Sequence, residues 1–109
     1  VERLGLARAL ALAMTGDKLM ADQALDWGLI WAVEDDCVAA ALTLAQRLAA
    51  MPTAALVATR HLLRDAGTRS LAQHLDIERD TQSRLGRTHD YFEGVSAFLQ
   101  KRTPQFKGE

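Results

Sequence analysis

Apolar residues recur at helical spacing along most of this 109-residue chain, and this repeat limits the possible fold more than any other feature. The clearest case is residues 38–49, where apolar side chains return every three or four positions until Pro52 ends the pattern. Hydrophobic residues make up 49% of the chain, most of them Ala and Leu, which favour helix, while the β-branched residues that favour strands are few. The sequence therefore predicts a mainly α fold.

Turn and cap residues divide the chain into about six expected helices. Gly16 can take the left-handed conformation that ends a helix, and Asp35 or Asp36 can cap the next long one. Ser70 with Gln73 forms a capping-box pattern. The expected helices cover residues 3–14, 20–27, 38–49, 53–66, 71–85 and a last stretch that Pro104 ends. Thr88 can cap this last helix, with Asp90 in its first turn.

Residues 29–33 form the one convincing extended segment, so we expect one short strand among the helices. No repeat, low-complexity tract or long linker interrupts the chain, and residues 1–109 are predicted to form a single helical region. At this level, an independent helical bundle and the helical end of a larger enzyme have the same pattern. The first residue is Val1 rather than Met, which favours the second interpretation.

Charge and cysteine content exclude several classes of partner. Thirteen basic and fourteen acidic side chains give a net charge of −1, so no global field attracts nucleic acid or an anionic membrane. No apolar run is long enough to span a bilayer, and Arg8 interrupts the one near the start. Cys37 is the only cysteine, which fits a reducing compartment; we expect a cytoplasmic protein and a small, buried cysteine side chain.

No histidine pattern indicates a metal site. His61, His74 and His89 lie thirteen and fifteen residues apart, which matches no local metal-ligand spacing. Glu78 lies on the apolar face of its helix, so we expect it to be partly buried and paired with an arginine such as Arg60. No metal is predicted.

The final segment, DYFEGVSAFLQKRTPQFKG at residues 90–108, combines an aromatic, a cation and a Pro-x-Phe exit. Phe98 and Lys101 lie three residues apart, one helical turn, and Pro104 and Phe106 follow them. An ammonium can pair with phosphate, and an aromatic ring can pack on the face of a base. This end of the chain is therefore predicted to close over a flat, anionic ligand.

The chain resembles the crotonase family, the enoyl-CoA hydratases and isomerases, along its whole length. The final segment is similar to the C-terminal signature of the family, and GLARALALAMTGDKLMADQALDWGLIWAVEDD is similar to the stretch that precedes it. Within the family, Trp27, Trp31 and residues 75–80 resemble the isomerases that act on a ring-epoxidised phenylacetyl-CoA. The resemblance implies the C-terminal helical part of a crotonase (ClpP/crotonase-like α/β) fold.

The same resemblance implies an acyl-CoA substrate, with coenzyme A as part of the substrate and no separate cofactor. Members hold the thioester enolate in an oxyanion hole of two backbone N–H groups. The oxyanion donors and catalytic carboxylates of the family precede the matched part, so this chain is expected to hold no catalytic residue and to be inactive alone. The resemblance also implies a homo-oligomer, a trimer or hexamer.

Phe98 and Lys101 match the family positions that cover the nucleotide of coenzyme A bound to a neighbouring subunit. For Phe98, a plain core position is an equal alternative; for Lys101, the alternative is a solvated charge, with Arg102 able to substitute or assist. Gly94 would let the last helix approach a neighbour closely, although it lowers helix propensity by about 1 kcal/mol.

Three functions therefore remain open: the ring-epoxide isomerase, an enoyl-CoA hydratase or double-bond isomerase of the same fold, and a non-catalytic helical interaction module. A helix-turn-helix regulator is disfavoured, since no helix gathers Arg, Asn and Gln on one face.

Overall fold

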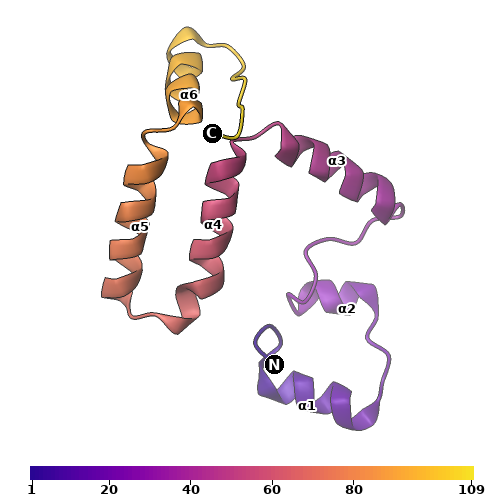
Figure 1. Ribbon diagram of the computed structural model, residues 1–109. Helices are drawn as coiled ribbons and strands as arrows, with labels where there is room; N and C mark the ends of the chain where they lie inside the picture. The colour runs from indigo at the N-terminus through magenta and orange to yellow at the C-terminus, as the bar shows by residue number, and fades with distance from the viewer. The chain divides into compact units, whose positions relative to one another are not determined.

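The computed structural model describes residues 1–109 and contains six α-helices and one short 3₁₀ helix (Figure 1). The elements are α1 (Gly5–Thr15), α2 (Ala21–Asp26), α3 (Cys37–Ala49), α4 (Thr53–Asp65), η1 (Ala66–Thr68), α5 (Leu71–Leu85) and α6 (His89–Gln100). The mainly α prediction and all six expected helices are confirmed. The chain divides into two compact units, Val1–Ala41 and Leu42–Glu109, with the division inside α3.

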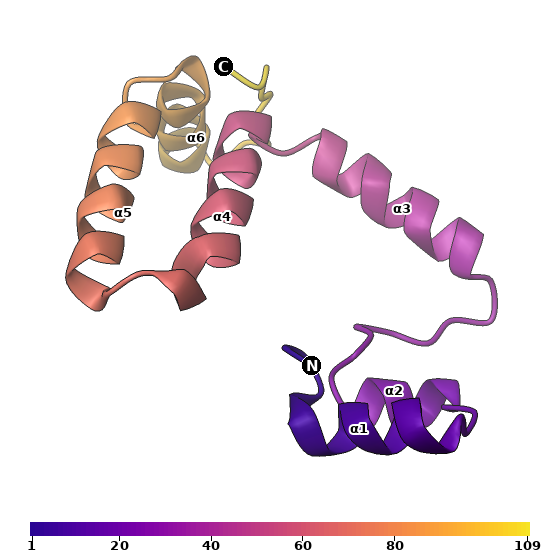
Figure 2. The ribbon, with the colours of Figure 1, turned by 60° about the horizontal axis from the view of Figure 1, so that its bottom comes forward.

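The first unit contains α1 and α2, which lie beside each other (Figure 2). Gly16 ends α1 as predicted, with φ 69° and its N–H donating to the Leu12 carbonyl at 3.0 Å. The guanidinium of Arg8 on α1 lies 4.9 Å from the ring centroid of Trp27, a cation–π contact between the two helices. Ala24 on α2 is the buried apolar side chain of this unit.

The predicted strand at residues 29–33 is wrong, because no strand forms anywhere in the chain. The backbone N–H groups of Leu29 and Ile30 both point back to the Ala24 carbonyl, at 2.9 and 3.4 Å. These two donors are therefore not available to a neighbouring strand. The apolar residues at 29–33 therefore belong to an irregular turn.

Asp36, one of the two predicted caps, accepts from the Ala39 N–H at 3.0 Å and so caps α3. Cys37 lies at the start of this helix and is exposed, so the expectation of a buried cysteine is wrong for this chain. Pro52 follows α3 and provides the N-cap of α4, as its backbone restrictions suggest.

In the second unit, α4 and α5 run antiparallel and are joined by η1 (Figure 1). The predicted capping box is present: the Ser70 hydroxyl accepts from the Gln73 N–H at 3.3 Å, and the Gln73 side chain accepts from the Ser70 N–H at 3.0 Å. The helix α6 lies near the end of this pair at which α4 begins and α5 ends, and the C-terminal tail (residues 101–109) returns toward the start of α4. There, Gly108 lies against Thr53.

The buried apolar core consists of three alanines, Ala24, Ala58 and Ala97. Large apolar side chains on the helices are exposed instead, among them Leu63 at 71% and Leu71 at 74%. Burying apolar surface stabilises a protein by about 25 cal/mol per Å², and these exposed faces do not gain that free energy. They are therefore suited to contact with further protein surface. No single helix is long and apolar enough to cross a membrane; α3 and α4 meet the length and composition test only as a bent pair.

Candidate functional site

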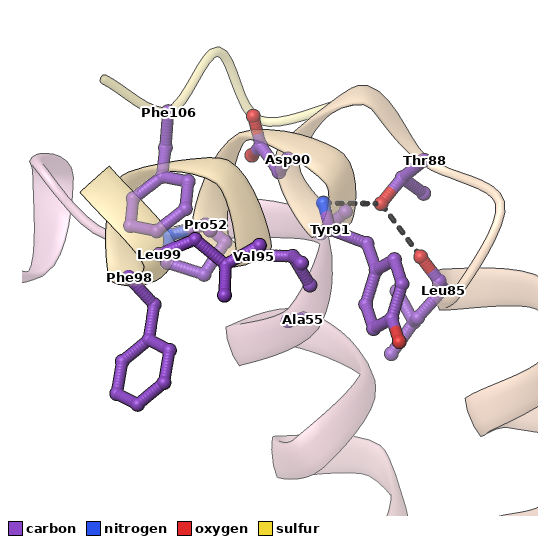
Figure 3. A pocket seen from close by; sticks show the side chains of 12 residues that line it. Pro52, Ala55, Leu85, Thr88, Asp90, Tyr91, Val95, Phe98, Leu99 and Phe106 are labelled. Carbon is purple, nitrogen blue, oxygen red and sulfur yellow. Dashed lines mark hydrogen bonds between the residues drawn. The ribbon is translucent and has the colours of Figure 1, made fainter. Parts of the chain in front are cut away.

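The helix α6 begins at a threonine cap and ends in a left-handed turn. The Thr88 hydroxyl accepts from the Tyr91 N–H at 3.3 Å and donates to the Leu85 carbonyl at 2.7 Å, which confirms the predicted cap (Figure 3). At the other end, Lys101 has φ 54° and ψ 39°. The helix ends at Gln100, before the stop predicted at Pro104, because Lys101 turns the chain.

The turn at Lys101 has the hydrogen bonds of a Schellman motif. The Lys101 N–H donates to the Phe98 carbonyl at 3.2 Å, and the Arg102 N–H donates to the Ala97 carbonyl at 3.0 Å. Glycine is the usual residue at this position, and a side chain there costs about 1 kcal/mol. Lys101 is the one non-glycine residue of the chain with positive φ. The turn therefore requires support from elsewhere.

Glu93, on the middle of α6, supplies that support through its carboxylate. Its two oxygens accept from the Arg102 guanidinium at 2.5 and 2.8 Å, and one of them also accepts from the Gln105 N–H at 2.7 Å. The Arg102 hydrogen bonds, followed by the Gln105 N–H, lower the pKa of Glu93 to about 2. The carboxylate therefore holds residues on both sides of Pro104 against the helix.

Asp90, in the first turn of α6, holds the end of the tail. It is 4% exposed, and its two oxygens accept from the N–H groups of Lys107 and Gly108 at 2.7 and 2.8 Å. The Asp90 N–H in turn donates to the Glu109 carbonyl at 2.9 Å. Burial alone would raise the pKa of Asp90, but the two backbone donors, helped by His89, bring it below its ordinary value. A buried charge is thus satisfied by the tail backbone.

An apolar groove of about 440 Å³ lies between α4 and α6, and the tail closes one side of it (Figure 3). Its lining residues are Pro52, Ala54, Ala55, Leu85, Thr88, Asp90, Tyr91, Gly94, Val95, Phe98, Leu99 and Phe106. The Phe106 ring packs over Gly94, where an added Cβ would lie 3.6 Å from the ring. The close approach predicted at Gly94 is therefore to the tail of the same chain.

Of the two predicted ligand residues, Phe98 lies in the last turn of α6 and Lys101 directly follows the helix. Phe98 is 82% exposed, so the core alternative is wrong for this chain, and its ring lines the groove while projecting away from Phe106 (Figure 3). Lys101 is exposed, and the ion pairs of the chain leave its ammonium free. Arg102 is engaged by Glu93, so the suggestion that it substitutes for Lys101 is not supported.

The other titratable candidates have local roles. Glu78 is partly buried as predicted, but it accepts from Gln82 at 3.1 Å rather than from Arg60. The Nδ1 atom of His74 is buried without a hydrogen-bond partner. His61 lies in a separate, more polar hollow between α4 and α5. No group of three or more His, Cys, Asp or Glu side chains could hold a metal ion.

The chain also matches known proteins, both in sequence and in structure. The enoyl-CoA hydratase/isomerase family matches residues 1–109, so the chain belongs to this family of enzymes. The predicted resemblance to the crotonases is confirmed. Among solved structures, an enoyl-CoA hydratase from Polaromonas sp. JS666 superposes with a TM-score of 0.89 at 35% identity, over 98% of this chain and 42% of that one. A second, from Geobacillus kaustophilus, has a TM-score of 0.90 at 29% identity, over 99% and 42%.

Curated relatives divide between isomerases and hydratases. The chain is 50% identical over 107 residues to the 1,2-epoxyphenylacetyl-CoA isomerase of Escherichia coli, covering 96% of this chain and 41% of that protein. It is 37% identical over 110 residues to the 2,3-dehydroadipyl-CoA hydratase of the same organism, covering 99% and 43%. The chain thus spans about two fifths of the length of the relatives it matches.

Asp90 and Glu93 are the structural residues that sequence reasoning missed. Asp90 was predicted only as a first-turn residue of α6, and Glu93 had no predicted role. Both belong to the segment DYFEG, in which two acids lie three residues apart on one helical face. Two acids on one face of a helix that is followed closely by Pro104 were the available signal.

Proposed function

We propose that this chain is the coenzyme A-covering and assembly part of an acyl-CoA isomerase that acts on 1,2-epoxyphenylacetyl-CoA. The observation that favours this substrate is the 50% identity to the isomerase of that name, against 37% to the dehydroadipyl-CoA hydratase. The reaction itself, ring expansion of the epoxide to an oxepin, depends on oxyanion donors and a carboxylate outside this chain. The chain has no catalytic residue in this proposal, and coenzyme A enters as part of the substrate without a separate cofactor.

Phe98 and Lys101 are the proposed contacts to the nucleotide end of coenzyme A. Phe98 offers an exposed ring on which an adenine can stack, and Lys101 offers an unpaired ammonium for phosphate one turn further on. Both residues lie where α6 meets the tail, so one ligand can contact them together. Stacking on an aromatic ring contributes about 1–3 kcal/mol, more than an exposed lysine–phosphate pair.

The proposed assembly is a cytoplasmic homo-oligomer, a trimer or hexamer. Support comes from the exposed apolar side chains of α6, Phe92 at 63% and Leu99 at 74%, which are suited to burial against a second copy. The single, exposed Cys37 is compatible with a reducing compartment. Light scattering on the natural polypeptide that contains this chain tests the assembly: a monomer at micromolar concentration contradicts it.

The substrate is tested by comparing kcat/KM of that polypeptide on 1,2-epoxyphenylacetyl-CoA and on 2,3-dehydroadipyl-CoA. We expect isomerisation of the epoxide to exceed hydration of the enoyl thioester by at least about a hundredfold, since differential transition-state binding determines such ratios. The reverse ratio would favour the hydratase, which is the second candidate because relatives of that name match the chain at 37% identity. Absence of any saturable response to coenzyme A would favour a helical interaction module.

The ligand contacts are tested with Phe98→Ala and Lys101→Ala, each assayed on the acyl-CoA and on the matching acyl-pantetheine thioester, which lacks the nucleotide. Phe98→Ala is expected to raise KM for the acyl-CoA about tenfold. Lys101→Ala is expected to raise it several-fold. Neither should change KM for the pantetheine thioester. Equal effects on both thioesters would contradict a nucleotide contact.

A further inference from the structure

The side chain of Lys101 leaves the main chain from a left-handed backbone and forms no ion pair within the chain. The residue has φ 54° and ψ 39°, and no ion pair of the chain uses its side chain. A lysine on a regular helical turn would leave in a different direction, because the path of Cα–Cβ follows φ and ψ. Whatever fixes this left-handed turn therefore also fixes the direction in which the Lys101 side chain leaves the main chain, and so the region that its flexible stem lets the ammonium reach.

Beyond the two backbone hydrogen bonds of the Schellman motif, further contacts that hold the turn come from Glu93, eight residues earlier on α6. Its carboxylate binds the guanidinium of Arg102, directly after Lys101, and the N–H of Gln105, four residues after it. The Glu93 side chain is 15% exposed, so its carboxylate is better shielded than the carboxylate of any other Arg–carboxylate pair of the chain, and Arg102 is 39% exposed. A two-point Arg–carboxylate contact fixes orientation as well as distance.

We infer that Glu93 is a positioning residue for Lys101: it locks the left-handed turn that directs the ammonium toward the nucleotide of coenzyme A. It also engages Arg102, so that this second cation does not compete for the phosphates. The inference rests on the proposed role of Lys101 in coenzyme A binding. Glu93 itself touches no substrate.

The test is a double-mutant cycle of Glu93→Gln and Lys101→Ala in the natural polypeptide, assayed on the acyl-CoA and the acyl-pantetheine thioester. Glu93→Gln keeps the size of the side chain but weakens its hold on Arg102. We expect KM for the acyl-CoA to rise about fivefold, as in Lys101→Ala, with kcat and the pantetheine KM unchanged. The double variant should be no worse than Lys101→Ala alone. Arg102→Gln, which breaks the pair from its other side, should give the same selective rise.

Glu78→Gln is the matched control, because Glu78 is also a partly buried glutamate on a helix but accepts from Gln82 on its own helix, α5. It should leave both KM values unchanged. Additive effects in the double variant would overturn the role of Glu93, as would an equal loss on both thioesters. An unchanged KM in Lys101→Ala would instead overturn the proposed nucleotide contact, and the positioning role with it.

Discussion

The α4–α5 pair and the α6–tail region are stabilised in opposite ways. In the first, the described polar contacts join residues one to four positions apart, such as the Ser70–Gln73 capping box and the Asp65–Arg69 ion pair at 2.7 Å. In the second, Asp90 and Glu93 bind donors nine to eighteen residues further along the chain. The helix pair depends on local chemistry, whereas the tail depends on two carboxylates that reach across a turn.

This difference separates the α4–α5 pair, which serves as a scaffold, from the α6–tail region, which carries the proposed ligand contacts. Local contacts form wherever their helix forms and do not depend on how the chain continues. The contacts of Asp90 and Glu93 exist only while the chain turns back at Lys101, so they couple the direction of that residue to the rest of the tail. The proposed coenzyme A contact is therefore on the part of the unit that long-range contacts maintain.

The largest expected effect comes from Asp90→Asn. Each carboxylate oxygen of Asp90 accepts one backbone N–H, and an asparagine must present an NH₂ group to one of them. Two donors then face each other in a buried position, and the tail loses a charge-assisted contact. Hydrogen exchange at the amides of Lys107 and Gly108 should accelerate about tenfold or more, because loss of a charged hydrogen bond exposes these amides to opening.

Mass spectrometry of the exchanging peptides is the measurement, and Asp80→Asn on α5 is the control. Asp80 is an exposed acid whose partner is Arg79 in the next position, so its loss should leave the tail unchanged. Equal protection of the tail in Asp90→Asn and the parent protein would show that the tail is held without this carboxylate.

The second-largest expected effect is a pH dependence of stability that arises from Glu93. Its pKa falls from 4.5 to about 2 on folding, so its contribution to stability is complete above pH 4.5 and is lost as the pH falls from there toward 2. The Gln105 amide donates to this carboxylate and reports its protonation. In protein labelled with ¹⁵N-glutamine, we expect the Gln105 resonance to stay constant from pH 7 to pH 5, with its midpoint well below 4.5. A midpoint near 4.5 would mean that Arg102 does not hold the carboxylate.

The same division explains what could be predicted from the sequence. The caps at Gly16, Ser70 and Thr88 were predicted correctly, and Asp36 was one of two predicted alternatives, because each cap acts on backbone groups within four residues. The strand predicted at residues 29–33 does not form. Backbone hydrogen bonds fold Leu29 and Ile30 back onto Ala24, and such bonds leave no pattern in the order of apolar and polar side chains.

For the candidate site, the sequence indicated the ligand residues but not the residues that hold them. Phe98 and Lys101 have side chains whose chemistry matches a nucleotide, and that chemistry is visible in the residue type. The contacts of Asp90 and Glu93 depend on which backbone donors return to α6, and this follows from the left-handed turn at Lys101. A residue that usually avoids that conformation gives no sequence signal for it.

A smaller effect is expected from Ser70→Ala, which removes one half of the capping box of α5. The exposed Gln73 N–H loses its acceptor within the chain, and the loss of such a cap costs about 1 kcal/mol. Chemical denaturation measures the change, and Ser83→Ala in the same helix is the control, since alanine there improves helix propensity. Coenzyme A binding should be unchanged. A parallel loss of binding would contradict the separation of the helix pair from the tail.

The smallest effect is expected from Arg79→Gln, although Arg79 makes more ion-pair contacts than any other residue of α5. Its guanidinium lies 2.9 Å from both Asp76 and Asp80, and the hydrogen bond to Asp80 contributes most to the rise in its pKa. All three side chains are about two-thirds exposed or more, so water and salt replace most of what the pairs provide. We expect no measurable change in Tm or in its salt dependence. The Glu93–Arg102 pair is shorter and less exposed than the Arg79 pairs, and it joins residues nine positions apart. If Arg79→Gln lowered Tm as much as Glu93→Gln does, neither exposure nor sequence separation would determine how much an ion pair stabilises this chain.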